Sequence, residues 1–217
     1  MEIQIKADLL GNNEDQALIN RNRYNQHGVF CINVMGSPGA GKTTLLERTI
    51  DMLKDKISIA VIEGDIYTAK DAERIEAHGI PVVQINTEGA CHLDAPMVNK
   101  VLDKFELEKL DLMIVENVGN LVCPVEFNTG EHIKVAVLSI IEGDDKPLKY
   151  PLIFRESEAV VLNKVDLAPF CDADIEQMKK DLKSINPNIN IFSVSCRTGE
   201  GLEAWSQWLL SETNKPR

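Results

Sequence analysis

The stretch GSPGAGKTT, residues 36–44, holds the residues with the clearest potential for chemistry. It fits the pattern G-x-x-x-x-G-K-[ST] and lies between a strand-like and a helix-like segment, as that pattern requires. Glycines let backbone N–H groups turn inward around phosphate oxygens, and the N-terminus of the following helix adds positive potential. Lys42 would contact the β- and γ-phosphates, and the Thr43 hydroxyl would bind Mg²⁺. The residues predicted to bind the phosphates are Gly36, Ser37, Pro38, Gly39, Ala40, Gly41, Lys42, Thr43 and Thr44.

Two later stretches could recognise the base of a nucleotide. VVLNKVDL places Asn163, Lys164 and Asp166 at the end of a strand-like segment. The Asp166 carboxylate could accept hydrogen bonds from N1–H and the 2-amino group of guanine, whereas adenine would leave it unpaired. The Lys164 stem could lie over the ring, and Asn163 could connect this loop to the phosphate loop. These features favour GTP over ATP.

A second base-contacting loop is predicted after the last strand-like segment, in SVSCRTGEG. Its backbone could meet guanine O6, although an ordinary strand-to-helix turn is the alternative. The residues concerned are Ser195, Cys196 and Arg197.

Two carboxylates follow strand-like segments, Asp65 in VIEGD and Glu116 in IVENVGN. In open α/β sheets, ligands bind at the carboxyl ends of strands. Either carboxylate could hold Mg²⁺ or its water, or position the attacking water, and the spacing does not decide between them. Capping of a helix is the alternative for each. Gly119 could present its N–H to the γ-phosphate. Together with Lys42, Asp65 and Glu116 are the candidate catalytic residues.

Two cysteines and a histidine lie in predicted loops, where the local sequence pattern does not indicate that they belong to the hydrophobic core. Cys91 stands beside His92 in TEGACHLDAP, and Cys123 follows in NVGNLVCPVE. Thiolates with imidazole suit zinc, and they can also bind nickel. One chain offers two sulfurs and one nitrogen, which is incomplete for a closed zinc site, so a second copy across a two-fold axis could complete it. The alternative is that the cysteines are buried as small hydrophobic residues.

Short Val- and Ile-rich runs alternate with longer amphipathic stretches along the chain, which predicts an α/β fold with a mainly parallel sheet and helices on both faces. We expect strands at 29–35, 57–62, 81–86, 110–116, 135–140, 159–163 and 189–195. We expect helices at 42–55, 68–78, 95–108, 173–184 and 201–211, with another at 8–27. No linker divides the 217 residues, so we predict a single domain over 1–217 with 1–27 as a helical extension.

The composition excludes several classes of partner. A net charge of −11 argues against non-specific binding to nucleic acid or to an anionic membrane. No apolar run approaches the roughly 20 residues that span a bilayer, and no secretory signal is visible. The five cysteines are odd in number and scattered, which indicates thiols in a reducing cytosol and hence a cytoplasmic protein.

The stretches GSPGAGKTT, EGD, ACHLDA, ENVGNLVCP and NKVDL, in this order, resemble the HypB family of hydrogenase-maturation GTPases, which help to insert nickel. The resemblance runs from about residue 25 to the C-terminus. It implies a P-loop GTPase of the signal-recognition-like (SIMIBI) branch that forms a homodimer with GTP. It also implies a nickel or zinc site at the dimer interface, formed by Cys91, His92 and Cys123. The implied partners are a HypA-type nickel chaperone and the large subunit of a [NiFe]-hydrogenase.

The resulting hypothesis is a GTP-driven metal switch, in which GTP and Mg²⁺ order the loop after Glu116 and so reposition Cys123. Three alternatives remain open: a GTPase switch that controls protein assembly without metal, a urease-type nickel GTPase, and a non-catalytic zinc-stabilised module. Urease-type relatives usually carry Cys-Pro-His, whereas here Cys123-Pro124 is followed by Val125. The sequence shows neither the cysteine-rich nor the histidine-rich tract of some HypB proteins, and Ser37 and Pro38 stand where related GTPases often carry a second lysine.

Overall fold

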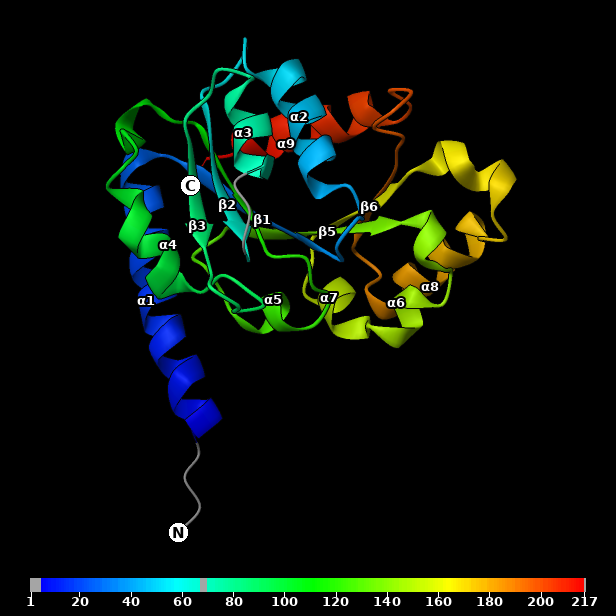
Figure 1. Cartoon of the computed structure of the whole chain (residues 1–217), viewed down its shortest axis with the longest axis horizontal. Coiled ribbons are helices and arrows are strands. Elements are labelled where there is room, and N and C mark those ends of the chain that lie inside the picture. The colour runs from blue at the N-terminus through cyan, green and yellow to red at the C-terminus, as the bar shows by residue number, and fades with distance from the viewer. Residues whose placement is uncertain (1–4, 67–69, 217) are drawn as a thin grey trace.

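Seven strands form one parallel sheet in the computed structural model, which describes residues 5–66 and 70–216 (Figure 1). Along the sheet the order is β3-β2-β4-β1-β5-β6-β7, and every neighbouring pair is parallel. The strands are β1 (Phe30–Gly36), β2 (Ile59–Asp65), β3 (Val82–Asn86), β4 (Leu112–Glu116), β5 (Ile133–Ser139), β6 (Ala159–Asn163) and β7 (Asn190–Ser193). All seven predicted strands are present, and the predicted α/β class with a parallel sheet is confirmed.

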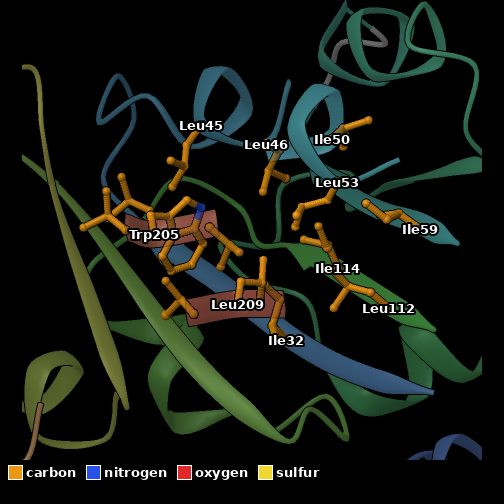
Figure 2. Packing of buried hydrophobic residues seen from close by; sticks show 14 of the residues in the cluster. Ile32, Leu45, Leu46, Ile50, Leu53, Ile59, Leu112, Ile114, Trp205 and Leu209 are labelled. Atoms are coloured by element: carbon orange, nitrogen blue, oxygen red, sulfur yellow. The ribbon is translucent and has the colours of Figure 1, made fainter. Parts of the chain in front are cut away.

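One face of the sheet is covered by α2 (Lys42–Leu53), α3 (Lys70–Glu76) and α9 (Leu202–Thr213) (Figure 1). Alternate residues of β1 point into this layer, among them Ile32, which packs with Leu45 and Leu209 in one buried cluster (Figure 2). Trp205 is fully buried in the same cluster, and its indole N–H donates to Thr49 Oγ1 at 2.9 Å. This layer fixes α2 against the sheet, and α2 begins directly after the phosphate loop.

The opposite face is covered in two halves. Over β2 and β4 lie α1 (Ile5–His27) and α4 (Ala95–Leu102), which share a buried cluster with Cys31 and Met113. Over β5 and β6 lie four further helices and their connections. The elements on this half are α5 (Cys123–Glu126), η2 (Ile140–Glu142), α6 (Lys146–Lys149), α7 (Pro151–Arg155), η3 (Val165–Phe170) and α8 (Ile175–Ile185).

Some predicted helix bounds are wrong. The helix predicted at 95–108 ends at Leu102, because the chain turns there so that Phe105 and Leu107 enter the same core cluster; only η1 (Leu107–Lys109) follows. The helix predicted at 68–78 is observed as α3, and 68–69 lie outside the described residues. The predicted N-terminal helix is observed as α1, while 1–4 also lie outside them.

Three short helices between β4 and β6 are absent from the prediction. Each of α5, α6 and α7 has a proline in its first two positions: Pro124, Pro147 and Pro151. Proline at the start of a helix is favourable, because its fixed φ suits the first turn and its missing N–H is not needed there. The prolines were therefore a signal for these helices, but four or five residues are too few for a helical periodicity of apolar residues to be recognised in the sequence. Among all described residues, no helix is both long and apolar enough to cross a membrane.

Candidate nucleotide and metal site

The carboxyl ends of the parallel strands meet at one edge of the sheet, and the phosphate loop leaves β1 there at Gly36. A Cβ at Gly36 would lie 2.3 Å from the Val137 carbonyl oxygen, so only glycine fits. Gly41 has a φ of +93°, and a Cβ there would lie 2.4 Å from Asn163 Nδ2. Both glycines are therefore required by the close approach of β5 and β6, which shapes the loop.

The two polar residues at the start of α2 point into the same region. Lys42 is buried, and its Nζ lies 3.4 Å from the Gly36 carbonyl oxygen. The buried Thr43 hydroxyl donates to Glu116 Oε1 at 2.7 Å. A cavity of about 470 Å³ opens above them, a volume typical of a small-molecule site. Its lining includes the predicted residues Pro38, Gly39, Gly41, Lys42, Thr43, Thr44, Asp65, Glu116, Gly119 and Lys164.

Two predicted members of the phosphate loop make their contacts away from this cavity lining. The Ser37 hydroxyl donates to the Glu142 carboxylate in η2. The Ala40 carbonyl oxygen accepts a hydrogen bond from Asn163 Nδ2 at 3.0 Å. These bonds hold the loop between the ends of β5 and β6.

A pair of buried carboxylates lines the phosphate cavity. Glu63 of β2 and Glu116 of β4 are directly opposite each other in the strand register, and each is 2% exposed. Burial, together with the nearby Glu116 charge, raises the pKa of Glu63 to about 8. Burial likewise raises the pKa of Glu116 to about 7, against the opposing effect of the Lys42 charge. The Oε2 atoms of both have no hydrogen-bond partner among the described residues.

Orphaned carboxylate oxygens beside a threonine hydroxyl are the donor set that a hard cation such as Mg²⁺ requires. A buried carboxylate without a partner is costly, and a bound cation would remove that cost. Asp65, half-buried at the end of β2, lines the same cavity. The residues present therefore fit a Mg²⁺ ion, which Thr43 and Glu116 would contact and Glu63 and Asp65 would hold directly or through water.

Five of the six predicted base-contacting residues, all except Ser195, line a second cavity of about 420 Å³, which shares Gly41, Thr44 and Lys164 with the first. Asp166 Oδ1 accepts from the Ser195 hydroxyl at 2.6 Å, and Asp166 Oδ2 lies 3.7 Å from the Arg197 guanidinium. The Arg197 side chain is 82% exposed, so its charge is at the mouth of the cavity.

Further contacts join the two base-contacting loops to each other and to the phosphate loop. Cys196 is buried, and its N–H donates to Asn163 Oδ1 at 3.4 Å. Lys164 Nζ donates to the Gly39 carbonyl oxygen at 2.7 Å, and Lys164 itself has a φ of +65°. The structure thus brings together all six residues that the sequence analysis assigned to the base.

Cys91, His92 and Cys123 also come together, from two segments more than 30 positions apart. Their ligand atoms lie within 4.8 Å of one another, and Cys91 Sγ lies 3.7 Å from His92 Nδ1. Burial lowers the pKa of His92, which favours the neutral imidazole that binds metals. A hydrogen bond with Cys91 raises the pKa of Cys123, as expected when two thiols share one site before a cation arrives.

The surroundings of this group fix its geometry. The His92 ring stacks on Phe127, with ring centroids 3.9 Å apart. Asp94 caps α4 by accepting from the Met97 N–H at 2.8 Å. Cys123 is the first residue of α5 rather than part of an open loop. Two sulfurs and one nitrogen leave room for a further ligand, which suits nickel or zinc.

The segment 117–120 connects the phosphate cavity to the Cys/His group. A Cβ at Gly119 would lie 2.9 Å from Pro38, so this glycine packs directly on the phosphate loop. The Asn120 N–H donates to the Gly36 carbonyl oxygen at 2.9 Å, while Asn120 Nδ2 donates to the Cys91 carbonyl oxygen at 3.4 Å. Asn117 is buried, and its Oδ1 accepts from the Leu93 N–H at 2.9 Å.

Sequence reasoning missed four residues of the site: Glu63, Arg74, Asn117 and Asn120. Glu63 had a recognisable signal, because a charged residue inside a strand buried on both faces needs a partner. Arg74 of α3 lines the phosphate cavity, where it pairs with Glu47 at 2.6 Å and donates to Thr44 Oγ1 at 3.0 Å. The two asparagines had no signal, since their contacts depend on the tertiary fold.

Comparison with known proteins identifies a family and several similar proteins. Residues 30–193 match the family described as CobW/HypB/UreG, nucleotide-binding domain. A hydrogenase maturation factor HypB from Azotobacter chroococcum is 48% identical over 209 residues, which cover 95% of this chain and 68% of the relative.

Solved structures of HypB proteins have the same fold as this chain. The crystal structure of HypB from Archaeoglobus fulgidus matches with a TM-score of 0.89 and 42% identity, covering 94% of this chain and 100% of that one. The crystal structure of HypB from Helicobacter pylori in complex with nickel matches with a TM-score of 0.87 and 39% identity, covering 93% and 95%. The signal recognition particle receptor FtsY of Elizabethkingia anophelis shares the fold alone, with a TM-score of 0.56 at 15% identity over 88% of this chain and 74% of that one. The predicted P-loop fold of the signal-recognition-like type is therefore confirmed.

Proposed function

Because the chain belongs to the HypB hydrogenase maturation factors of the CobW/HypB/UreG family, we propose that it is a GTP-hydrolysing nickel metallochaperone. In this proposal, the nucleotide state controls the metal affinity of the group formed by Cys91, His92 and Cys123. The observation that carries it is the segment 117–120, which contacts the phosphate loop on one side and the Cys91 segment on the other. The same metal ligands would also accept zinc.

The phosphate site supplies what phosphoryl transfer needs, which is mainly positioning and stabilisation of charge. Backbone N–H groups of the phosphate loop and the Lys42 ammonium would hold the phosphates in place. Thr43, Glu116 and the neighbouring carboxylates would hold Mg²⁺, which would offset the negative charge of the β- and γ-phosphates. Asp65 or Glu63 would orient the attacking water, because both lie at the carboxyl end of β2 within the cavity.

Guanine selectivity is assigned to Asp166, and Asp166→Asn tests it. A carboxylate that accepts two donors from guanine contributes about 1.5–3 kcal/mol per charged hydrogen bond. We expect the variant to bind GTP about 10- to 100-fold more weakly. Binding of xanthosine triphosphate should improve, since the asparagine amide can donate to the extra carbonyl of xanthine. Competition of each triphosphate against GTP hydrolysis measures both effects.

Asp172→Asn is the matched control, because Asp172 lies on the nearby exposed segment after η3 and outside the base cavity. It should hydrolyse GTP as the parent protein does. An Asp166→Asn protein that still rejects ATP and xanthosine triphosphate as strongly as the parent would rule out this base assignment.

Metal transfer is proposed to follow the phosphate state through the segment 117–120. When the γ-phosphate is present, the Gly119 N–H would donate to it, and Gly119 already lies against Pro38. A shift of this segment would move Asn120 and Asn117, which hold the Cys91 and Leu93 backbone. Coupling of this kind requires a two-state element that both ligands bias, and contact of the segment with both sites supports this role for it.

The partners are proposed from the family. A homodimer formed with GTP could complete the coordination of the metal, because one chain supplies two sulfurs and one nitrogen. A HypA-type chaperone and the large subunit of a [NiFe]-hydrogenase are the proposed donor and recipient of nickel. A metal-independent assembly switch is the alternative, and inert Cys91 and Cys123 thiols would favour it.

A further inference from the structure

Two buried asparagines of α1 hold the two metal-ligand segments together. Asn13 Oδ1 accepts from the Ala95 N–H at 2.9 Å, and Asn13 Nδ2 donates to the Asn128 carbonyl oxygen at 2.8 Å. Asn20 Nδ2 donates to the Ala95 carbonyl oxygen at 2.9 Å and to the Thr129 carbonyl oxygen at 3.0 Å. Each side chain thus bridges the same two segments, 91–95 and 123–129. We call these two residues the asparagine clamp.

The two asparagines of the clamp lie on one buried face of α1. Asn13 and Asn20 are seven residues apart, two turns of α1, and so share one face of the helix. They are 3% and 0% exposed, although asparagine is mostly found at the surface. Gln16, one turn before Asn20, donates to Asn20 Oδ1 at 3.2 Å and leaves the Asn20 amide N–H₂ to bind the two carbonyl oxygens.

Helix α1 packs closely against the segment around Gly130. A Cβ at Gly130 would lie 2.6 Å from Asn20 Cβ and 3.0 Å from the Ala17 carbonyl oxygen. Gly130 also has a φ of +101°, and Arg21 Nε donates to its carbonyl oxygen at 2.7 Å. α1 runs beside α4 along this side of the sheet (Figure 1). A helix seated this tightly can fix the spacing of the segments that it joins.

The bridged atoms are near the metal ligands in the chain. Ala95 is three positions after His92 and begins α4, and Asn128 is five positions after Cys123, directly after Phe127, on which His92 stacks. A buried polar network that is fully hydrogen-bonded favours one geometry over others of similar energy. The clamp therefore limits how far Cys91 and His92 can move from Cys123 on this side, while Asn117 and Asn120 hold the Cys91 segment on the nucleotide side.

We propose that Asn13 and Asn20 are positioning residues for the metal site, and that α1 preorganises Cys91, His92 and Cys123 for metal binding. This inference rests on the proposed function, because it takes these three residues as the metal ligands. Outer residues that orient metal ligands typically contribute 10–100-fold to metal affinity. Without the clamp, the ligand atoms would have to be ordered when the metal binds, and affinity would fall.

The test compares Asn20→Ala with Asn25→Ala in the full chain. Asn25 lies on the same helix and also links it to the body of the protein, through a 2.9 Å hydrogen bond to His132 Nε2, but its hydrogen bonds reach neither bridged segment. Ni²⁺ is titrated into reduced, metal-free protein loaded with GDP and Mg²⁺, and the thiolate-to-nickel charge-transfer band is recorded. GDP affinity and the thermal unfolding temperature are measured on the same samples.

We expect Asn20→Ala to bind Ni²⁺ about 10- to 100-fold more weakly, with a changed charge-transfer spectrum and with GDP affinity within twofold of the parent. Asn25→Ala should keep the parental nickel affinity and spectrum. Should Asn20→Ala not fold, Asn13→Ala gives the same test, because it removes the Asn13 bridge between Ala95 and Asn128. A folded clamp variant with parental nickel affinity would overturn the inference.

Cys123→Ser separates this inference from the function on which it rests. Suppose that Cys123→Ser loses nickel binding while both clamp variants keep the parental affinity. This result would refute the positioning role of Asn13 and Asn20 but would support the assigned metal site. Parental nickel affinity in Cys123→Ser would instead show that the assigned ligands are wrong.

Discussion

Replacing Lys42 by alanine is expected to reduce kcat for GTP hydrolysis by on the order of 10²–10³. The Lys42 side chain is buried at the edge of the phosphate cavity, where its charge would act on the β- and γ-phosphates. Electrostatic groups aimed at developing charge contribute more to phosphoryl transfer than any covalent step by the protein. Release of inorganic phosphate from GTP under single-turnover conditions measures the effect without the contribution of product release.

Lys54→Ala is the matched control for this variant. Lys54 caps the other end of α2 and pairs with Asp51 at 3.3 Å, remote from the phosphate loop. It should hydrolyse GTP within a few-fold of the parent. A Lys42→Ala protein with parental turnover would place the hydrolytic site elsewhere.

The second large effect is expected at Cys123. Serine has nearly the same shape as cysteine but does not provide a thiolate, so Cys123→Ser should remove a first ligand to nickel while preserving α5. We expect nickel affinity to fall by more than the 10–100-fold that residues orienting metal ligands contribute. The thiolate-to-nickel absorbance should decrease with it.

Cys171→Ser controls for the loss of a thiol as such. Cys171 is also half-buried, but it lies after η3, and its Sγ is 3.9 Å from the Ala168 carbonyl oxygen rather than near the Cys/His group. The Cys171→Ser protein should bind nickel with the same affinity as the parent. Equal affinity in Cys123→Ser and Cys171→Ser would leave the Cys/His group without a metal function.

The sequence predicted the sheet because each buried parallel strand is a local run of apolar residues, and the sum of such runs has few alternative arrangements. The phosphate loop was predictable because the spacing of its glycines, lysine and threonine is a local sequence pattern, although the contacts that require Gly36 and Gly41 come from β5 and β6. The Gly41 Cβ position is filled by Asn163 Nδ2, and the same Asn163 amide donates to Ala40 as expected. The Cys/His group was proposed from its residue types, and the fold brings its three ligand atoms within 4.8 Å of one another.

Other features could not be derived from local patterns. The end of α4 at Leu102 depends on where Phe105 and Leu107 find a core, which only the tertiary fold decides. The asparagines at 13, 20, 117 and 120 have no periodic signature, because each acts through hydrogen bonds to backbone atoms distant in the chain. Glu63 directly follows the strand predicted at 57–62, and its pairing with Glu116 depends on the strand register.

The measurement that tests the central claim most directly is a Ni²⁺ titration of reduced, metal-free protein in two nucleotide states, read by thiolate-to-nickel absorbance. One titration contains GDP and Mg²⁺, and the other contains a non-hydrolysable GTP analogue and Mg²⁺. If the segment 117–120 transmits the phosphate state to Cys91 and Cys123, the nickel affinity or the stoichiometry will differ between the two. The same affinity and stoichiometry in both states would contradict nucleotide-gated metal binding.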